Sequence, residues 1–337
     1  MTLTTAIFAF LGLAALIATA GTVLTRAGDR IADLTGLGEA LIGGVLLGGI
    51  SSLSGVMTSV TAAWDGHAHL SFSNAVGGIA AQTVFLAFAD LTYRRANLEH
   101  ASASLSNLMQ GILLMLMLTF VLLTLAGPDV TLWHIHPSSI LLLLIYLFGT
   151  RLVAKAQQSP MWKPINTKET VEDKPETDLH KINRPWLYTR FLLSAAVVGT
   201  AGYFVAKVAV VIAQQSGLTQ SFVGALFTSV ATSLPELVIS IAAVRQGALT
   251  LAVANIIGGN SFDVLFLSFA DIAYTEGSLY HQVGDSEAFV LALGVLLAGT
   301  LMMGMLYRER EGIAQAGWES ITTIGLFFVG YILLYFM

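Results

Sequence analysis

The chain has 337 residues, of which 55% are hydrophobic and only 11% are charged, and its mean hydropathy is +0.75. Soluble domains carry about 25% charged residues, so the composition excludes an ordinary soluble protein and predicts an all-α polytopic membrane protein. The formal net charge is −5, and the sequence has no cysteine. The lack of cysteine excludes disulfides, thiolate metal sites and cysteine nucleophiles.

Apolar runs of about 20 residues, the length that spans a bilayer, occur ten times along the chain. The ten predicted spans are residues 3–24, 37–61, 68–91, 104–126, 137–155, 187–213, 218–244, 249–273, 287–307 and 319–336. The longest polar stretch, residues 156–186, is rich in Lys, Glu, Asp and Pro. It predicts a flexible cytoplasmic linker between a first five-helix half at 1–155 and a second at 187–337.

Apart from Lys207, lysine and arginine lie in or beside alternate connections between the predicted spans. They follow spans one, three, five, seven and nine, whereas the opposite loops hold acidic residues and no Lys or Arg. The positive-inside rule makes the basic side cytoplasmic. We therefore expect a multi-pass protein of the plasma (cytoplasmic) membrane with both termini external.

Two carboxylates, Glu236 and Asp263, lie near the middle of the seventh and eighth predicted spans. A charge there costs roughly 2.5 kcal/mol or more on insertion scales, so such residues usually face a cavity, a partner or an ion. The segment Ser233-Leu-Pro-Glu236 has the spacing of a capping box, and Pro235 fits a first helical turn. The pattern predicts a broken helix, whose freed polar groups line a cavity or bind a ligand.

Hard cations take carboxylate, amide, carbonyl and hydroxyl oxygens. Asn260 and Asp263 are three residues apart and share a helix face. The predicted cation ligands in this half are Thr232, Ser233, Glu236, Asn255, Asn260 and Asp263. A purely structural alternative is that Ser233 and Glu236 cap a kink while Asp263 pairs with Lys207, the one basic residue that departs from the alternation of basic and acidic connections.

An internal repeat relates the two halves. A shift of 181 residues aligns 36–93 with 217–274 without a gap, with 18 identities in 58 positions. Five spans separate the copies, so they have opposite orientations, as in secondary transporters with a site at the midplane. The first copy offers the neutral candidate ligands Ser51, Ser52, Asn74 and Gln82.

The second copy, with Thr-Ser-Leu-Pro-Glu236 and Asn255-Ile-Ile-Gly-Gly-Asn260-Ser-Phe-Asp263, resembles the second α-repeat of the calcium/cation antiporter superfamily, which includes the sodium/calcium exchangers. The resemblance implies ten helices in two inverted halves, with helices one and six sliding past the rest. It also implies a calcium site flanked by sodium sites. By position, Glu236 is then the main calcium carboxylate and Asp263 an acidic ligand or proton acceptor.

The first repeat departs from the family pattern. A second Pro-Glu is expected there, and the sequence has Ser54-Gly55 instead, while Gln82 aligns with Asp263. Loss of a carboxylate weakens a calcium site, and a monovalent ion or a proton-coupled cycle becomes easier to accommodate. The first α-repeat is therefore degenerate.

The expected function is secondary active cation antiport by alternating access, with calcium exchanged for sodium or protons. The alternatives are a monovalent-cation/proton exchanger and a non-transporting relative that acts as a membrane scaffold or sensor. The expected partners are inorganic cations, Ca²⁺ and/or Na⁺, and the lipid bilayer, with no cofactor and no nucleic acid. No nucleophile–base pair has a recognisable spacing, so the chain is not predicted to be an enzyme.

Two further features allow two interpretations each. Lys207 either reaches the acidic residues as a tethered ammonium or snorkels to the external interface. His67 and His69, in an external loop beside Asp65, either bind zinc or sense pH, or are simply solvated.

Overall fold

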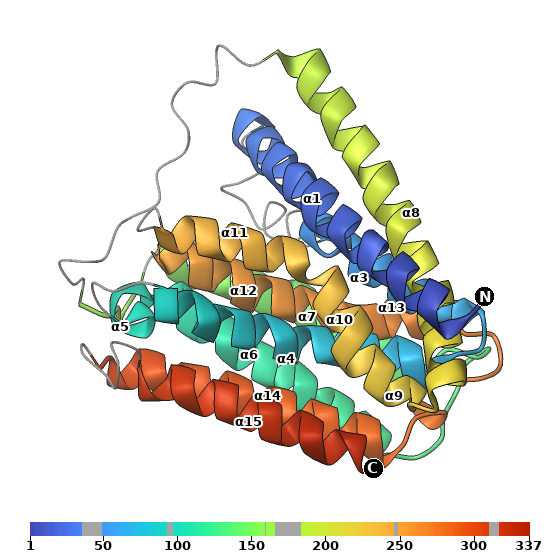
Figure 1. Cartoon of the computed structure of the whole chain (residues 1–337). Helices are drawn as coiled ribbons and strands as arrows, with labels where there is room; N and C mark the ends of the chain where they lie inside the picture. The colour runs from blue at the N-terminus through green and yellow to red at the C-terminus, as the bar shows by residue number, and fades with distance from the viewer. Residues whose placement is uncertain (36–48, 93–96, 159, 166–182, 246–248, 310–316) are drawn as a thin grey trace.

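The computed structural model describes the whole chain except residues 36–48, 93–96, 159, 166–182, 246–248 and 310–316. The described part folds as an all-helical bundle (Figure 1). Its elements are α1 Leu3–Thr35, α3 Leu53–Trp64, α4 Ala68–Thr92, α5 Leu98–Ser102, α6 Leu105–Leu125, α7 Pro137–Gln158, α8 Arg184–Ser216, α9 Gln220–Phe222, the π-helix η3 Val223–Thr228, α10 Ser229–Thr232, α11 Leu234–Arg245, α12 Leu249–Asp263, α13 Leu265–Ala273, the 3-10 helix η4 Leu279–His281, α14 Asp285–Tyr307 and α15 Trp318–Tyr335.

Within the described residues, eight helices are long and apolar enough to cross a membrane. A ninth is added if Gln220–Thr232 and Leu234–Arg245, which bend by 48° at their junction, form one broken span. The predicted second span, 37–61, lies partly outside the described residues, and α3 accounts for its end. The linker predicted at 156–186 also lies mostly outside them.

The two longest helices, α1 and α8, pack against each other and cross over the remaining bundle (Figure 1). Each has 33 residues, a length of about 50 Å, which exceeds the roughly 30 Å hydrocarbon layer and requires tilting or projection. They run in opposite directions, and the bounds of α1 shifted by 181 residues are those of α8. The repeat register thus extends from the first helix of each half.

Two equivalent aspartates fix the ends of the repeats. Asp90, at the end of α4, accepts a hydrogen bond from Leu98 N at 2.8 Å, and Asp271, at the end of α13, accepts one from Leu279 N at 2.8 Å. Asp90 also accepts a hydrogen bond from Ser320 Oγ of α15 at 2.8 Å, and Asp271 accepts one from Ser139 Oγ of α7 at 2.7 Å. Each serine lies at the start of the last helix of the other half. The equivalent bonds tie the halves together through the same geometry.

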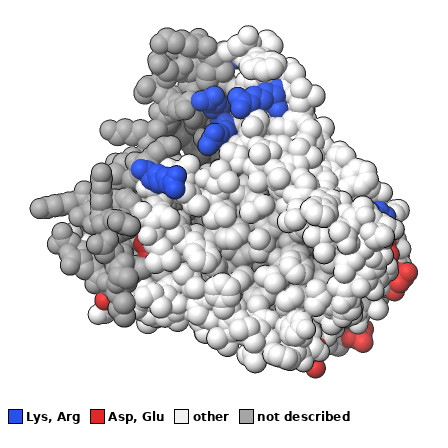
Figure 2. Space-filling model, in the orientation of Figure 1, with Lys and Arg blue, Asp and Glu red and all other residues white. Residues whose placement is uncertain are grey.

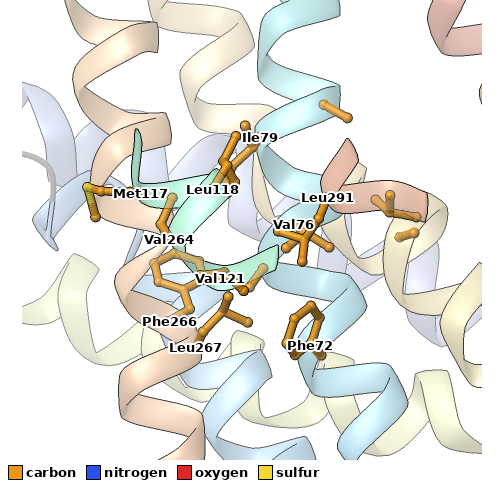
Figure 3. Close-up of a cluster of buried hydrophobic side chains, with 14 of the residues drawn as sticks. Phe72, Val76, Ile79, Met117, Leu118, Val121, Val264, Phe266, Leu267 and Leu291 are labelled. Carbon is orange, nitrogen blue, oxygen red and sulfur yellow. The ribbon is translucent and has the colours of Figure 1, made fainter. Parts of the chain in front are cut away.

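The main apolar core surrounds α4, whose side chains are mostly buried. Figure 3 shows its centre, where α4, α6, α13 and α14 meet; the labelled residues are Phe72, Val76, Ile79, Met117, Leu118, Val121, Val264, Phe266, Leu267 and Leu291. Outward-facing helices keep large apolar side chains exposed, for example Phe148 on α7 and Leu192 on α8. Such exposure is what a lipid-facing surface requires.

Charged side chains separate along the bundle. On the face shown in Figure 2, the largest group of described Lys and Arg side chains lies toward one end and a group of Asp and Glu lies toward the other. We call the end that bears Arg151, Arg245 and Arg308 the basic face, and the end that bears Asp129, Glu276 and Asp285 the acidic face. The helices between the two faces carry the apolar spans.

Candidate cation site

The predicted break in the seventh span is present and lies next to an element that the sequence did not reveal. The segment begins as α9 and passes through one π-helical stretch, η3, before α10 ends at Thr232. Ser233 leaves helical geometry at φ −94° and ψ 5°, and α11 begins at Leu234 with Pro235 in its first turn. Gly77 of α4 lies directly against the Ala225 backbone, where a Cβ atom has no space. The π-helix and α4 therefore pack backbone to backbone beside the break.

The first repeat is broken at the equivalent residue. Ser52 has φ −90° and ψ 11° and precedes α3, although Ser54 stands where the second repeat has Pro235. A proline is therefore not required for the break. Two helix contacts are also equivalent under the repeat. Gly21 of α1 lies against Pro235, and its repeat equivalent Gly202 of α8 lies against Ser54, the equivalent of Pro235.

Between the two breaks lies a cavity of about 10 Å³, enough for roughly one water-sized particle. Its lining is Ser52, Gly55, Asn74, Gly78, Gln82, Thr232, Ser233, Glu236, Asp263 and Phe266. None of these ten residues is basic, and two are acidic. Seven of the ten predicted ligands thus meet in one small polar chamber, with residues from both halves.

Asp263 has both carboxylate oxygens occupied by the first half. Ser52 Oγ donates to Oδ1 at 2.6 Å, and Gln82 Nε2 donates to Oδ2 at 2.7 Å. Gln82 Nε2 also lies 3.3 Å from Ser233 Oγ. Ser52 and Ser233 are equivalent in the repeat, as are Gln82 and Asp263, so these four residues surround the pseudo-twofold axis. The contact of Ser233 Oγ with Gln82 is not the bond of the predicted capping box.

Of the two acidic residues that line the chamber, Glu236 is the one with a carboxylate oxygen that can still accept a hydrogen bond or bind a cation. Its side chain is 1% exposed, and its Oε2 atom has no hydrogen-bond partner. Asn74 also lines the cavity with an unpartnered oxygen, Oδ1, while its Nδ2 donates to Ser59 Oγ at 2.9 Å. A buried unpaired charge is costly unless an ion or a proton neutralises it. The chamber therefore has the donor set and the charge of a cation site.

The position of the missing carboxylate is closed by an aromatic ring. A Cβ atom at Gly55 would lie 2.5 Å from Phe266 Cε2 and 3.0 Å from its Cζ. Phe266 belongs to the main apolar core (Figure 3). Sequence reasoning missed this residue, and it also missed Gly78, where a Cβ atom would lie 3.5 Å from Asp263 Oδ2. The signals were the paired glycines and the phenylalanine identical in both repeats.

Three predicted ligands do not line the cavity. Asn260 turns its amide to Thr83 Oγ1 at 3.0 Å. Ser51 is buried beside Ser52 without reaching the chamber lining, and Asn255 lies nearer the basic face on α12. The i, i+3 spacing of Asn260 and Asp263 placed them on one face, but α12 ends at Asp263 and only the aspartate reaches the chamber.

Lys207 stays away from both acidic ligands. Its Nζ pairs with Asp65 Oδ2 at 2.5 Å and lies 5.4 Å from the centre of the Tyr203 ring. The structural alternative that pairs Asp263 with Lys207 is therefore wrong. The histidines next to Asp65 also take separate partners, since His67 lies 3.1 Å from Gln220 and His69 3.0 Å from Glu287.

Comparison with known proteins agrees with this geometry. The sequence profile described as "Sodium/calcium exchanger protein" matches residues 5–154 and 186–336. The putative antiporter CaxA of Alkalimonas amylolytica is 27% identical over 305 residues, which cover 90% of this chain and 91% of that protein. The sodium/calcium exchanger MaX1 of Methanosarcina acetivorans is 27% identical over 144 residues, 42% of this chain and 41% of that protein. The inner membrane protein YrbG of Escherichia coli is 28% identical over 145 residues, 43% of each.

Solved structures share the fold. The H⁺/Ca²⁺ exchanger CAX superposes with a TM-score of 0.69 at 13% identity, over 98% of this chain and 86% of that chain. The sodium-calcium exchanger NCX_Mj superposes with a TM-score of 0.63 at 17% identity, over 98% and 99% of the two chains. The family match over both halves, and not the shared fold alone, makes this chain a multi-pass membrane transporter rather than an enzyme. The chain belongs to the sodium/calcium exchanger protein family.

Proposed function

We propose that this protein is a secondary cation antiporter that binds one Ca²⁺ ion between Glu236 and Asp263 and exchanges it for protons or sodium by alternating access. One observation carries the proposal: two buried carboxyl groups face the same chamber where the two inverted halves cross. Two carboxylates neutralise one divalent ion, and the hydroxyl and amide groups of both halves supply further oxygen ligands.

The charge of the chamber supports exchange, because any ions that replace a divalent cation there must also supply two positive charges. With no basic residue in the chamber lining, two buried carboxylates need two positive charges whenever the site is closed. Two protons or two sodium ions satisfy this requirement as well as one calcium ion does. The helices α1 and α8, which cross the bundle together, are the elements that we propose move relative to the site, and we propose residues 1–155 and 187–337 as the two functional halves.

A second candidate, exchange of a monovalent cation for a proton, is favoured by one specific observation. The space opposite Gly55 is occupied by the Phe266 ring, so the chamber holds two carboxylates and no third. We further propose, from the alternation of basic and acidic loops, that the basic face is cytoplasmic and that the protein lies in the plasma membrane with external termini.

The test is ion flux across the membrane of proteoliposomes that hold the purified protein. Radioactive calcium is placed inside, and a sodium or a proton gradient is imposed in turn. Gradient-driven calcium movement that disappears in Glu236→Gln supports calcium exchange. If no calcium moves under either gradient with folded protein, calcium exchange is wrong, and the same vesicles are assayed for sodium and potassium movement.

A further inference from the structure

Two buried glutamates meet at the basic face, outside the chamber. Glu99 lies on α5, in the connection between α4 and α6, and Glu319 lies in the first turn of α15. Each residue is 1% exposed, and neither lines the chamber. His100, the neighbour of Glu99, donates from Nδ1 to the backbone oxygen of Arg308 at 2.8 Å. This contact places the two glutamates at the basic end of the bundle.

The neighbouring polar side chains leave both glutamates incompletely bonded. Asn97 Nδ2 donates to Glu319 Oε1 at 2.5 Å, and Asn97 Oδ1 accepts from Glu99 N at 3.0 Å. Asp90 uses its two carboxylate oxygens for the bonds that anchor the end of α4. The Oε2 atoms of Glu99 and Glu319 are fully buried and have no hydrogen-bond partner. Such atoms cost roughly 1–3 kcal/mol each if they stay unpaired, and more if they are charged.

The glutamate pair also lacks a positive counter-charge among the described residues. Asp90 contributes a further negative charge beside it. Two helices that pack against α5 are α12 and α14. The only charged residue of α12 is Asp263, in the chamber. Beyond the end of α14, the Arg308 guanidinium donates to backbone oxygens, and Glu309 accepts from Trp318 N. Two adjacent buried carboxyl groups in such surroundings cannot both stay ionised.

We infer that Glu99 and Glu319 form a proton-binding site, separate from the cation chamber, in which one proton is shared between the two carboxyl groups. The two side chains make a hydrogen-bond contact, and ionised carboxyl groups only accept, so one of the two must carry a proton. Burial, followed by the neighbouring carboxyl groups of Asp90 and Glu319, holds the pKa of Glu99 well above its usual range. The site does not depend on the proposed exchange function.

The second half has no such pair at the equivalent junction. Under the shift of 181 residues, Glu99 corresponds to Tyr280 and Glu319 to Ser138. There the Tyr280 hydroxyl lies 3.4 Å from a serine hydroxyl, and the anchoring aspartate is common to both junctions. The backbone anchor is therefore shared by the two ends of the molecule, whereas the glutamate pair is confined to the basic face.

The shared proton makes the contact between α5 and α15 depend on pH. While it is bound, it joins the connection between α4 and α6 to the start of α15. When it leaves, two adjacent buried carboxylates repel each other and the contact weakens. Because the pKa of Glu99 is raised, this stabilisation is complete below the usual glutamate range and is lost as pH rises through the raised value.

Infrared spectroscopy of the full-length protein in lipid vesicles tests the site, because a protonated carboxyl group has a carbonyl band that a carboxylate lacks. At pH 7, Glu99→Gln should remove one such band from the wild-type spectrum. Glu319→Gln should shift that band and lower the proton affinity of Glu99 at least about tenfold, which moves the midpoint of its titration by about one pH unit. The exposed Glu276→Gln is the control and should leave the band unchanged.

Two results of these spectra overturn the inference. If Glu99→Gln leaves the protonated-carboxyl bands unchanged, no proton is held at this site. If Glu319→Gln leaves the frequency and the titration midpoint of the Glu99 band unchanged, the proton is not shared. Calcium chloride and sodium chloride are then added in turn to Glu236→Gln at pH 7, where the Glu99 band should persist. Loss of the band on addition of either salt would show that the pair takes a metal ion instead.

Amide hydrogen exchange of the wild type tests the contact without any substitution. After correction for the chemical exchange rate, opening of α5 should increase about tenfold per pH unit between the usual glutamate range and the midpoint of the Glu99 band, because the opened form releases the proton. Above the midpoint it should level off. The equivalent segment η4 should show no such increase, and the same pH dependence in both segments would refute a proton-dependent contact.

Discussion

The contact between Gly55 and Phe266 gives a prediction that can be worked out from distances. A Cβ atom at Gly55 would lie 2.5 Å from the nearest ring carbon, whereas carbon atoms normally approach to about 3.5–4.0 Å. The overlap is therefore about 1 Å, and overpacking of this kind costs typically about 1–3 kcal/mol. Gly55→Ala should lower the free energy of unfolding by that amount, despite the better helix propensity of alanine.

The matched control is Gly325→Ala on α15, because a Cβ atom there meets nothing within 4 Å. Alanine at that position should leave stability unchanged or raise it by up to about 1 kcal/mol through helix propensity. Thermal unfolding of both variants in the same detergent gives the comparison. If Gly55→Ala is as stable as Gly325→Ala, Phe266 does not close this position and the reasoning fails.

The same contact decides how the missing carboxylate can be restored. Gly55→Glu alone should be strongly destabilised, whereas Gly55→Glu with Phe266→Ala has space for the side chain, and the two substitutions should couple favourably by roughly 1–3 kcal/mol. A third carboxylate at about 4 Å adds roughly 4 kcal/mol per unit charge at an effective dielectric of 20, offset in part by its burial.

We expect calcium to bind the double variant at least tenfold more tightly than wild type, a gain of about 1.4 kcal/mol, measured by calorimetric titration. The control Gly55→Gln with Phe266→Ala has the same shape without the charge and should show no such gain. Equal calcium affinity in the two double variants would refute the argument that the lost charge weakens calcium binding.

Three further predictions follow from individual carboxylates. Glu236→Gln should reduce gradient-driven calcium flux at least 100-fold. Thermal stability should not fall, because the substitution removes an unpartnered buried charge. A variant that transports calcium at the wild-type rate would exclude Glu236 as a ligand. Asp271→Asn should cost about 2 kcal/mol or more, because charged hydrogen-bond acceptors are worth about 1.5–3 kcal/mol each, and the exposed Asp285→Asn should change denaturant stability little; equal effects would contradict the anchoring role. Burial, followed by two neighbouring carboxylates, raises the pKa of Glu99, which lies between spans, well above its usual range. The unfolded chain then releases this proton first, so stability falls as pH rises from the usual glutamate range toward the raised value. Glu99→Gln should stabilise the protein at pH 7 more than at pH 4, and equal melting shifts at both pH values would rule this out.

The helix break and the chamber could be predicted from the sequence because a buried charge and a proline inside an apolar span are each compatible with few structures. A carboxylate such as Glu236 in an apolar span needs a cavity or an ion, and Pro235 next to Ser233 ends a helix. The inverted repeat then placed the neutral residues Ser52 and Gln82 opposite. Residue type and spacing determine these features, and both are visible in the sequence.

The orientation of individual side chains was less predictable. Asn260 was expected to share the site with Asp263, but α12 ends at the aspartate and the asparagine turns toward Thr83. The π-helical stretch η3 changes the helical phase before Thr232, which a period of 3.6 residues does not anticipate. Phe266 closes the chamber through long-range packing, and no local pattern in the sequence encodes such a contact.

The two halves share one backbone plan but divide the chemistry unequally. Both carboxylates of the chamber belong to the second half, and the first half supplies Ser52 and Gln82, which donate to Asp263. A cation that binds Asp263 competes with these two donors for the same oxygens, so binding weakens the contact that holds the halves together at the chamber. A ligand shifts a conformational equilibrium only through its different affinity for the two states, and this competition provides such a difference. Under the proposed function, the neutral residues of the first repeat therefore link cation occupancy of the chamber to the packing of the two halves.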